Sequence, residues 1–275
     1  MKPIYITDLD HTFLHSDQSV SDFSEKVWNE KAKSAILSVA TARSYQKSRD
    51  FLSKLHLDAP MILLDGTMIV SPEKKLIDIK TVNKGLGDAI ISEGAKFNIY
   101  PFVITLNDVK TLDESFLFPA SLNTHQHGVL ENYRNDPRME KCEDIRAKER
   151  NLKLVYFGSK KVLEPLYIEL KKIFGKELEY KLSPEKYSDG WFLTILHPEG
   201  DKAHALTKVM EYLKRDIADV TVFGDSVNDI GMFELAGTSV AVSNALDEVK
   251  KMADIVLPHS NDEDAVARYL ENIAN

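Results

Sequence analysis

Cysteine is almost absent from this sequence. Cys142 is the only one among 275 residues, so no disulfide can form within the chain. Such a composition predicts a reducing compartment. Cys142 lies in the charged run MEKCEDIRAKER, which favours an incidental helix position for it over a role as a nucleophile.

Long apolar runs and low-complexity segments are also missing. No stretch approaches the roughly 20 apolar residues that span a bilayer. The N-terminal MKPIYITDLD turns acidic before it reaches signal-peptide length. Glycine and proline are not in excess, with 12 and 10 residues, and no repeat of fixed period is present. We therefore expect a soluble, cytoplasmic, globular protein without a membrane partner.

The chain carries a net negative charge. The formal net charge is −8, from 35 basic and 43 acidic residues. A chain this acidic has no global electrostatic reason to bind a polyanion, so we expect no nucleic-acid partner. A small phosphate ester remains possible, because one lysine and one metal ion can hold it locally.

Both ends of the chain alternate short apolar runs with amphipathic helices. Runs that are apolar on both faces and separated by helices are typical of a doubly wound, mainly parallel sheet, so we predict an α/β fold. The expected strands are Pro3–Thr7, Ala35–Val39, Met61–Leu64, Val220–Phe223, Ser239–Val242 and Asp254–Leu257, and the expected helices are Ser21–Lys33, Ser44–His56, Lys202–Leu213, Asn228–Ala236 and Asp262–Asn272.

The middle of the chain has a different pattern. Loosely alternating strands such as Leu152–Phe157 stand between the predicted helices Glu131–Arg150 and Lys160–Phe174. Mixed strands and helices predict an inserted α+β unit. The turn-rich segments Ser71–Lys75 and Ser183–Gly190 mark its expected ends. We therefore predict a discontinuous core, residues 1–80 and 191–275, with residues 81–190 as an inserted domain.

Two carboxylates stand where the first predicted strand ends. Asp8 and Asp10 are one residue apart in TDLDHT, and in an open parallel sheet ligands bind beyond the carboxyl ends of the strands. A divalent cation relieves the repulsion between two such groups, and hard oxygen ligands suit Mg²⁺. Asp8 can then attack phosphorus while Asp10 transfers protons. Taken alone, the pair also fits a solvent-facing turn.

A second polar group follows the predicted strand Val220–Phe223. Gly224-Asp-Ser-Val-Asn-Asp229 places Asp225 at the strand end, and Asn228 and Asp229 in the next helical turn. A helix N-cap accounts for one acidic residue. It does not account for three polar groups at the end of a strand that has a buried pattern.

Two further elements lie between these motifs. Ala40-Thr-Ala-Arg-Ser44 joins a strand to a helix, where the Thr41 hydroxyl and backbone N–H groups can bind an anion, or Thr41 and Ser44 can simply be caps. Lys202 opens a helix, although the helix dipole disfavours a cation there. The alternative for Lys202 is a solvated side chain paired with Asp201.

In this order the four elements resemble those of the haloacid dehalogenase superfamily of phosphohydrolases, in the Cof-type or IIB group with a large α/β cap. The resemblance implies Asp8 as nucleophile, Asp10 as general acid/base, and Thr12 as the mark of a phosphatase. It implies Mg²⁺ held by Asp8, the Asp10 carbonyl and Asp225, with Asp229 as support. Phosphoryl oxygens would meet a set of donors formed by the Leu9 N–H, Thr41, the Ala42 N–H, Lys202 and Asn228.

The sequence departs from the family pattern at several positions. Ala42 and Ala203 stand where the family usually has glycine, and Asp65 stands where it has asparagine. We expect Ala42 to be tolerated if its φ is negative, and Asp65 to add a negative charge beside the substrate entrance. Residues 40–45 and the helix at Asn228 also resemble sucrose-phosphate phosphatases, which hints at a sugar phosphate.

Candidates outside these motifs carry less information. His125 and His127 would share one face of a strand, yet a polar loop is the simpler interpretation. Substrate contacts are conceivable at Tyr133, Arg134 and Arg138, for which solvated helix positions are the alternative, and at the flanking residues His11 and His15.

Three functions remain open from the sequence. The first is a Mg²⁺-dependent phosphatase for a small phosphorylated metabolite, with a sugar phosphate as the leading substrate and an aspartyl-phosphate intermediate. The second is a phosphotransferase or phosphomutase on the same core. The third is a non-catalytic phosphate-binding module such as a receiver domain, which is usually much shorter. The expected assembly is a monomer or a small homo-oligomer.

Overall fold

The computed structural model describes residues 1–131, 133–185 and 190–273. The chain divides into a first unit, Met1–Ile79 with Asp201–Asn275, and a second unit, Lys80–Gly200. Within the described ranges, no helix combines the length and the apolar character needed to cross a membrane.

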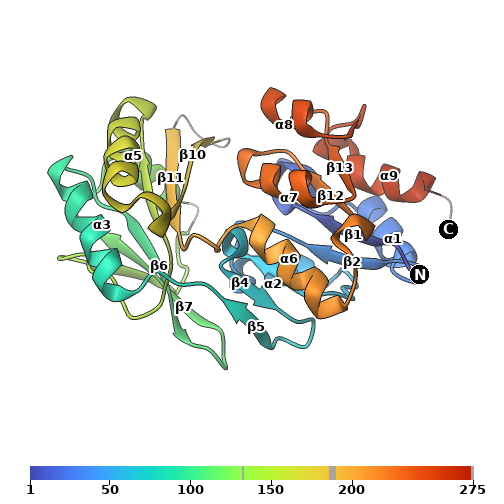
Figure 1. The fold of residues 1–275 in the computed structure, drawn as a ribbon, viewed down its shortest axis with the longest axis horizontal. Helices are drawn as coiled ribbons and strands as arrows, with labels where there is room; N and C mark the ends of the chain where they lie inside the picture. The colour runs from blue at the N-terminus through green and yellow to red at the C-terminus, as the bar shows by residue number, and fades with distance from the viewer. Residues whose placement is uncertain (132, 186–189, 274–275) are drawn as a thin grey trace. The chain divides into compact units, whose positions relative to one another are not determined.

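A parallel sheet forms the centre of the first unit, with the strand order β14-β13-β12-β1-β2 (Figure 1). Its strands are β1 Ile4–Thr7, β2 Ile36–Val39, β12 Val220–Gly224, β13 Thr238–Ala241 and β14 Ile255–Val256. β1 and β12 are buried nearly throughout, because helices cover a parallel sheet on both faces. The predicted α/β fold is confirmed.

The helices of this unit follow the predicted ones, except for α8, which was not predicted. They are α1 Asp22–Lys31, α2 Tyr45–Leu52, α6 Lys202–Leu213, α7 Ile230–Leu235, α8 Asp247–Met252 and α9 Ala265–Asn272, with short turns η1 Leu9–Phe13, η2 Leu64–Gly66, η4 Ile217–Asp219, η5 Val227–Asp229 and η6 Asn261–Glu263. Ser21 caps α1 by accepting a hydrogen bond from the Ser24 N–H. Trp28 on the same helix packs edge-on against Phe13, with ring centroids 4.9 Å apart.

A small antiparallel sheet adjoins the parallel one. It consists of β3 Met61–Leu63, β4 Met68–Val70 and β5 Leu76–Ile79. Ser71–Lys75 is therefore the connection between two paired strands and not the joint between units. Turn signals mark any reversal of the chain, so they do not by themselves locate a domain boundary.

The second unit is built on a mixed sheet in the order β10-β11-β9-β6-β7-β8. Its pairs are antiparallel except for β7 with β8. Helices α3 and α5 cover one face, where they pack on a shared apolar cluster (Figure 1). The elements are β6 Phe102–Asp108, β7 Asp113–Pro119, β8 Met139–Cys142, β9 Asn151–Gly158, β10 Glu179–Glu185, β11 Gly190–Leu196, α3 Lys84–Lys96, α4 Thr124–Glu131, α5 Lys160–Phe174 and η3 Gly175–Glu177.

The predicted start of the second core segment at residue 191 is wrong. β11 pairs with β9 and β10, so it belongs to the sheet of the second unit, which ends at Gly200. Of the predicted joint Ser183–Gly190, Ser183–Glu185 belong to β10 and Gly190 begins β11, and residues 186–189 lie outside the described ranges. An apolar strand looks alike in either sheet, and pairing alone decides its unit.

The predicted helix Glu131–Arg150 is also wrong. α4 ends at Glu131, and β8 then pairs parallel with β7, so Cys142 lies in a strand. Pro137 lacks an N–H group and interrupts a helix. Asn135 adopts a left-handed φ of 67° just before it, so the charged pattern of this segment does not continue as a helix.

Candidate active site

Three neighbouring strands deliver the site residues to one edge of the parallel sheet. In the registers of β1, Thr7 lies beside Phe223 on one side and Val39 on the other. The Asp8 N–H continues the ladder by donating to the Phe223 carbonyl at 3.0 Å. The segments that follow these strands therefore meet, as parallel strands require.

Lys202 lies at the start of α6 and is fully buried. Its Nζ donates to Asp8 Oδ1 and to Asp229 Oδ1, both at 2.7 Å. Burial acts to lower the pKa of Lys202, but attraction to Asp229 and Asp8 outweighs it and raises that pKa. The alternative of a solvated lysine paired with Asp201 is therefore wrong, since Asp201 instead caps α6 through the His204 N–H.

Gly66 allows the start of α6 to lie against the turn η2. Its φ is +116°, and a Cβ there would lie 2.1 Å from the Asp201 carbonyl oxygen. No side chain fits that space, so glycine permits the close approach. The position of Lys202 thus depends on a glycine far away in the sequence.

Asp225 and Asp229 are held by donors of different kinds. The Thr12 hydroxyl donates to Asp225 Oδ1 at 3.0 Å. Asp229 Oδ2 accepts the N–H groups of Asp225 and Ser226, both at 3.0 Å. A Cβ on Gly224 would lie 2.5 Å from Asp229 Cγ, so glycine is needed for this carboxylate to fold back on the backbone.

The chemistry of the donor set fits a divalent cation. Asp8, Asp225 and Asp229 are buried and offer carboxylate oxygens within 4.8 Å of one another. Burial raises the pKa of Asp8 well above its ordinary value; Lys202 lowers it, whereas Asp229, Asp225 and Asp10 raise it. A hard cation would offset this excess negative charge. Both oxygens of Asp229 are already engaged, Oδ1 by Lys202 and Oδ2 by two N–H groups, whereas Lys202 contacts only Oδ1 of Asp8, so Asp8 and Asp225 are the better ligands.

Asp10 contacts a residue that the sequence analysis did not single out. Arg43 donates from Nε to Asp10 Oδ2 at 2.8 Å and from Nη2 to Asp10 Oδ1. Arg43 lies two residues after Thr41, in the same strand-to-helix connection. That placement beside a predicted anion site was the available signal for a functional arginine.

The remaining predicted phosphate contacts lie around this edge. Leu9 and Thr41 are buried, and Thr41 Oγ1 accepts the Arg43 N–H at 3.1 Å. Ala42 is not among the positive-φ residues, so its methyl group causes no left-handed strain, as expected.

Asn228 is engaged by Asp65. Asn228 Nδ2 donates to Asp65 Oδ1 at 3.0 Å. Asp65 is only 5% exposed and has a φ of 66°, a conformation that Asp and Asn tolerate better than most residues. The Asp65 carboxylate is thus buried against an amide, and its place beside the substrate entrance stays a prediction.

The candidate residues of the second unit have different surroundings in the part of the chain that the structure describes. His125 and His127 lie on α4, where residues two apart point to different sides, so the expected strand or loop is wrong. Arg134 pairs with Glu131, both well exposed. Arg138 is instead mostly buried, and its guanidinium contacts Glu114, Asp136 and the face of Phe116.

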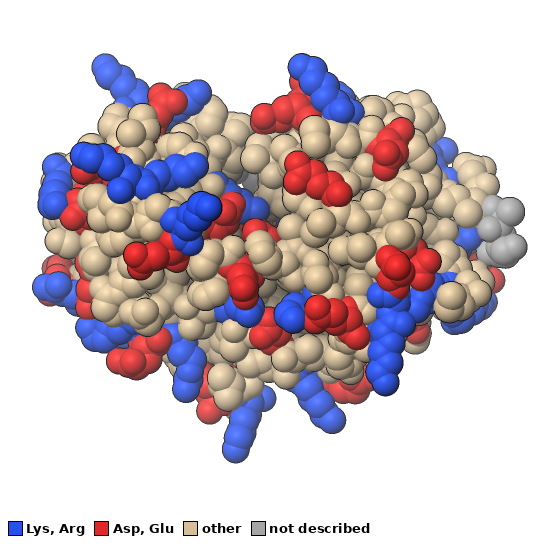
Figure 2. Space-filling view, in the orientation of Figure 1, with Lys and Arg blue, Asp and Glu red and all other residues tan. Residues whose placement is uncertain are grey.

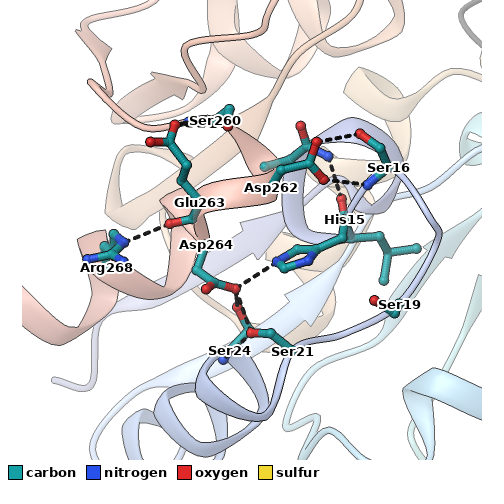
Figure 3. Close-up of polar contacts among 12 residues, drawn as sticks. His15, Ser16, Ser19, Ser21, Ser24, Ser260, Asp262, Glu263, Asp264 and Arg268 are labelled. Carbon is teal, nitrogen blue, oxygen red and sulfur yellow. Dashed lines mark hydrogen bonds and ion pairs between the residues drawn. The ribbon is translucent and has the colours of Figure 1, made fainter.

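His15 belongs to a polar network that anchors the segment after the first motif. Its Nε2 lies 2.9 Å from Asp264 Oδ1, which also accepts the hydroxyls of Ser21 and Ser24 (Figure 3). Beside it, Asp262 accepts the N–H and hydroxyl of Ser16, both at 2.7 Å. His11 contributes its carbonyl, which accepts from Asn244 Nδ2 at 2.8 Å.

Several known proteins resemble the chain, two of them over nearly its whole length. The 5-amino-6-(5-phospho-D-ribitylamino)uracil phosphatase YwtE of Bacillus subtilis is 27% identical over 99% of this chain and 98% of its own length. A second phosphatase of that name and organism, YcsE, is 29% identical over 96% of this chain and 93% of its own. A pyridoxal phosphate phosphatase of Escherichia coli, YbhA, is 39% identical over 35% of this chain and 36% of its own.

Solved structures share the fold. A haloacid dehalogenase-like hydrolase from Bacteroides thetaiotaomicron has a TM-score of 0.81 at 21% identity, covering 100% of both chains. The family model described as haloacid dehalogenase-like hydrolase matches residues 5–270. The resemblance found in the sequence is thus confirmed: the chain belongs to the haloacid dehalogenase-like hydrolase family and is an enzyme of its phosphatase class.

Proposed function

We propose that this phosphatase is Mg²⁺-dependent and hydrolyses a small phosphorylated metabolite through an aspartyl-phosphate on Asp8. The observation that carries the proposal is the buried cluster in which Lys202 bridges Asp8 and Asp229 beside Asp225. Phosphoryl transfer needs charge stabilisation and positioning more than further covalent chemistry. A single nucleophile, Asp8, beside Lys202 and a bound Mg²⁺ would meet that need.

Each residue has a defined role in this scheme. An oxygen of Asp8 attacks phosphorus, and Asp10 gives a proton to the leaving oxygen and later takes one from water. Lys202 stabilises charge on the phosphoryl oxygens, together with Thr41, Asn228 and the N–H groups of Leu9 and Ala42. Thr12 and Asp229 hold Asp225 and Lys202 in place.

The metal would be held by Asp8, Asp225 and the main-chain carbonyl of Asp10. When bound, it supplies positive charge that reduces the repulsion between the Asp8 carboxylate and the phosphate. The excess of buried carboxylates over lysine in the cluster supports this assignment. Oxygen-only ligands favour Mg²⁺ over softer metals.

A phosphate ester of a sugar or sugar alcohol is the substrate class we favour. Two relatives that match nearly the whole chain are named for a substrate with a phosphorylated ribityl group. The net charge of −8, and the mixture of acidic and basic side chains over the face in Figure 2, support a small molecule over a polyanion.

The test compares Asp10→Asn with the wild type on two esters. Without proton transfer the mutant should lose about 10²–10⁴-fold in kcat on an alkyl phosphate. The loss should shrink on p-nitrophenyl phosphate, where phosphoenzyme formation limits the rate, because that leaving group needs little protonation. Equal losses on both esters, or acyl-phosphate trapped on Asp10, contradict the assignment. Steady release of inorganic phosphate by the wild type separates hydrolysis from phosphotransferase or binding functions.

A further inference from the structure

Arg43 holds both oxygens of the Asp10 carboxylate. The two hydrogen bonds come from Nε and Nη2 of one guanidinium, and the Arg43 side chain is 12% exposed against 26% for Asp10. A guanidinium is planar and rigid, so a two-point contact fixes the plane of the carboxylate as well as its distance. A single point charge would leave the carboxylate free to rotate.

Arg43 is itself fixed at its backbone and at its head group. Its N–H donates to Thr41 Oγ1 at 3.1 Å, and its carbonyl accepts the Leu64 N–H at 3.0 Å. At the other end, Nη2 donates to Gln18 Oε1 at 2.9 Å. Long side chains usually lose entropy on being ordered, and here contacts at both ends maintain that order.

The segment that carries Gln18 is anchored in turn. On one side of Gln18, Ser16 binds Asp262 through its N–H and hydroxyl; on the other, Ser21 binds Asp264 (Figure 3). Gln18 has a φ of 67° at the tip of this segment. A chain of contacts therefore runs from the region of η6 through Gln18 and Arg43 to Asp10.

We propose that Arg43 is a positioning residue for the general acid/base, with Gln18 setting the angle of its guanidinium. The inference rests on the proposed role of Asp10. A proton donor must lie within hydrogen-bond reach of the leaving oxygen. Asp10 lies three residues after the end of β1 and just before His11, whose φ is 55°. The backbone hydrogen bonds of the sheet therefore do not fix the Asp10 side chain.

The experiment is a double-mutant cycle between Arg43→Met and Asp10→Asn, measured as kcat at saturating substrate. On an alkyl phosphate, Arg43→Met alone should lose about 10- to 100-fold, the cost of a misplaced catalytic group. The loss should be smaller on p-nitrophenyl phosphate. In the Asp10→Asn background the same substitution should change kcat by less than about twofold, because the group it positions is already absent.

Additive losses would overturn the inference, because Arg43 would then act on the substrate directly. A loss that appears only in KM, equal for both esters, would overturn it too. Arg43→Lys, which keeps the charge without the two-point contact, should be impaired in kcat in the same ester-dependent way. Full activity in Arg43→Lys contradicts the inference, and this variant runs the cycle if Arg43→Met does not fold.

A control variant, together with the results for the wild type and Asp10→Asn, shows which proposal a negative result contradicts. Arg49→Met removes an exposed guanidinium from α2 that donates to Gln46 Oε1, and it should leave kcat within about twofold, as for most exposed positions. No turnover by the wild type would defeat the proposed function itself. Turnover with an unaffected Asp10→Asn would defeat the role of Asp10, and the role of Arg43 with it. A normal Asp10 result with an additive cycle would defeat only the inference about Arg43.

Discussion

The two units of the chain each bury a cluster of charged groups, and the clusters differ in how many acidic groups face each basic one. In the first unit, the buried Asp8, Asp225 and Asp229 offer carboxylate oxygens within 4.8 Å of one another, and the Lys202 ammonium group binds two of them, Asp8 and Asp229. In the second, the Arg138 guanidinium uses Nε, Nη1 and Nη2 on Glu114 and Asp136. Excess buried charge is costly and is typical of sites that bind or react. The second cluster has only one carboxylate more than its cation, and the Arg138 guanidinium pairs directly with both carboxylates, which is typical of a structural ion pair.

The two clusters also differ in where they lie relative to the sheet of their own unit. The first lies beyond the carboxyl ends of parallel strands, where a doubly wound fold collects its loops. The second ties β7 to the chain just before β8, with Arg138 4.5 Å from the centre of the Phe116 ring. The comparison indicates that substitutions in the first cluster cost activity, whereas those in the second cost stability.

Removing the nucleophile should have the largest effect. Asp8→Asn should reduce kcat by about 10⁴-fold or more, because losing a covalent nucleophile leaves only binding and electrostatic effects. Steady-state phosphate release measures the loss, and a fluoride-based phosphoryl analogue probes the trapped state. Acyl-phosphate formed in the Asp8→Asn protein would place the nucleophile elsewhere.

Removing divalent cations should come next. Chelation should cut turnover by at least about 10²-fold, equivalent to about 2.7 kcal/mol of lost charge stabilisation, and Mg²⁺ should restore it. Ca²⁺ should restore little, because its longer bonds and looser geometry misplace the nucleophile. Mg²⁺ should also raise the Tm of the wild type through mass action. Full turnover after chelation would remove the metal from the scheme.

Lys202→Met should cost about 10²-fold in kcat, the usual loss on removing one electrostatic stabiliser. The substitution also leaves Asp8 and Asp229 facing each other without their shared cation, so Mg²⁺-free protein should lose stability by about 3–5 kcal/mol, as for a broken buried pair. Urea unfolding measures the change. A variant with wild-type kcat would reduce Lys202 to a structural role.

Arg138→Met should have the smallest effect on turnover. We expect kcat on p-nitrophenyl phosphate within about twofold of wild type, with a loss of stability of about 3 kcal/mol from the two carboxylates left without their partner. Thermal unfolding and the same kinetic assay check both. Lost activity with an unchanged Tm would make Arg138 a substrate contact and erase the contrast between the clusters.

Local patterns predicted most elements of the first unit. The predicted helix Lys202–Leu213 agrees with α6 at both ends, and the predicted start at Ser21 lies one residue before α1. Strands β1 and β12 fall within one residue of the apolar runs. These elements are coded by residues close in sequence, so pattern and propensity suffice. The helix predicted for residues 131–150 is wrong, because Pro137 and the pairing of β8 with β7 outweigh the charged pattern of this segment.

The sequence by itself determined which chemistry the chain can perform: the order of Asp8, Thr41, Lys202 and Asp225 relative to strands and helices named the family. Only the tertiary structure decided how those groups meet. Three sets of contacts join residues 27 to 194 positions apart in the sequence. They are the hydrogen bonds of Lys202 to Asp8 and Asp229, those of Arg43 to Asp10, and that of Asn228 to Asp65. Contacts between distant loops leave no periodic signal in a single sequence, because they depend on strand register and on close approaches such as that at Gly66.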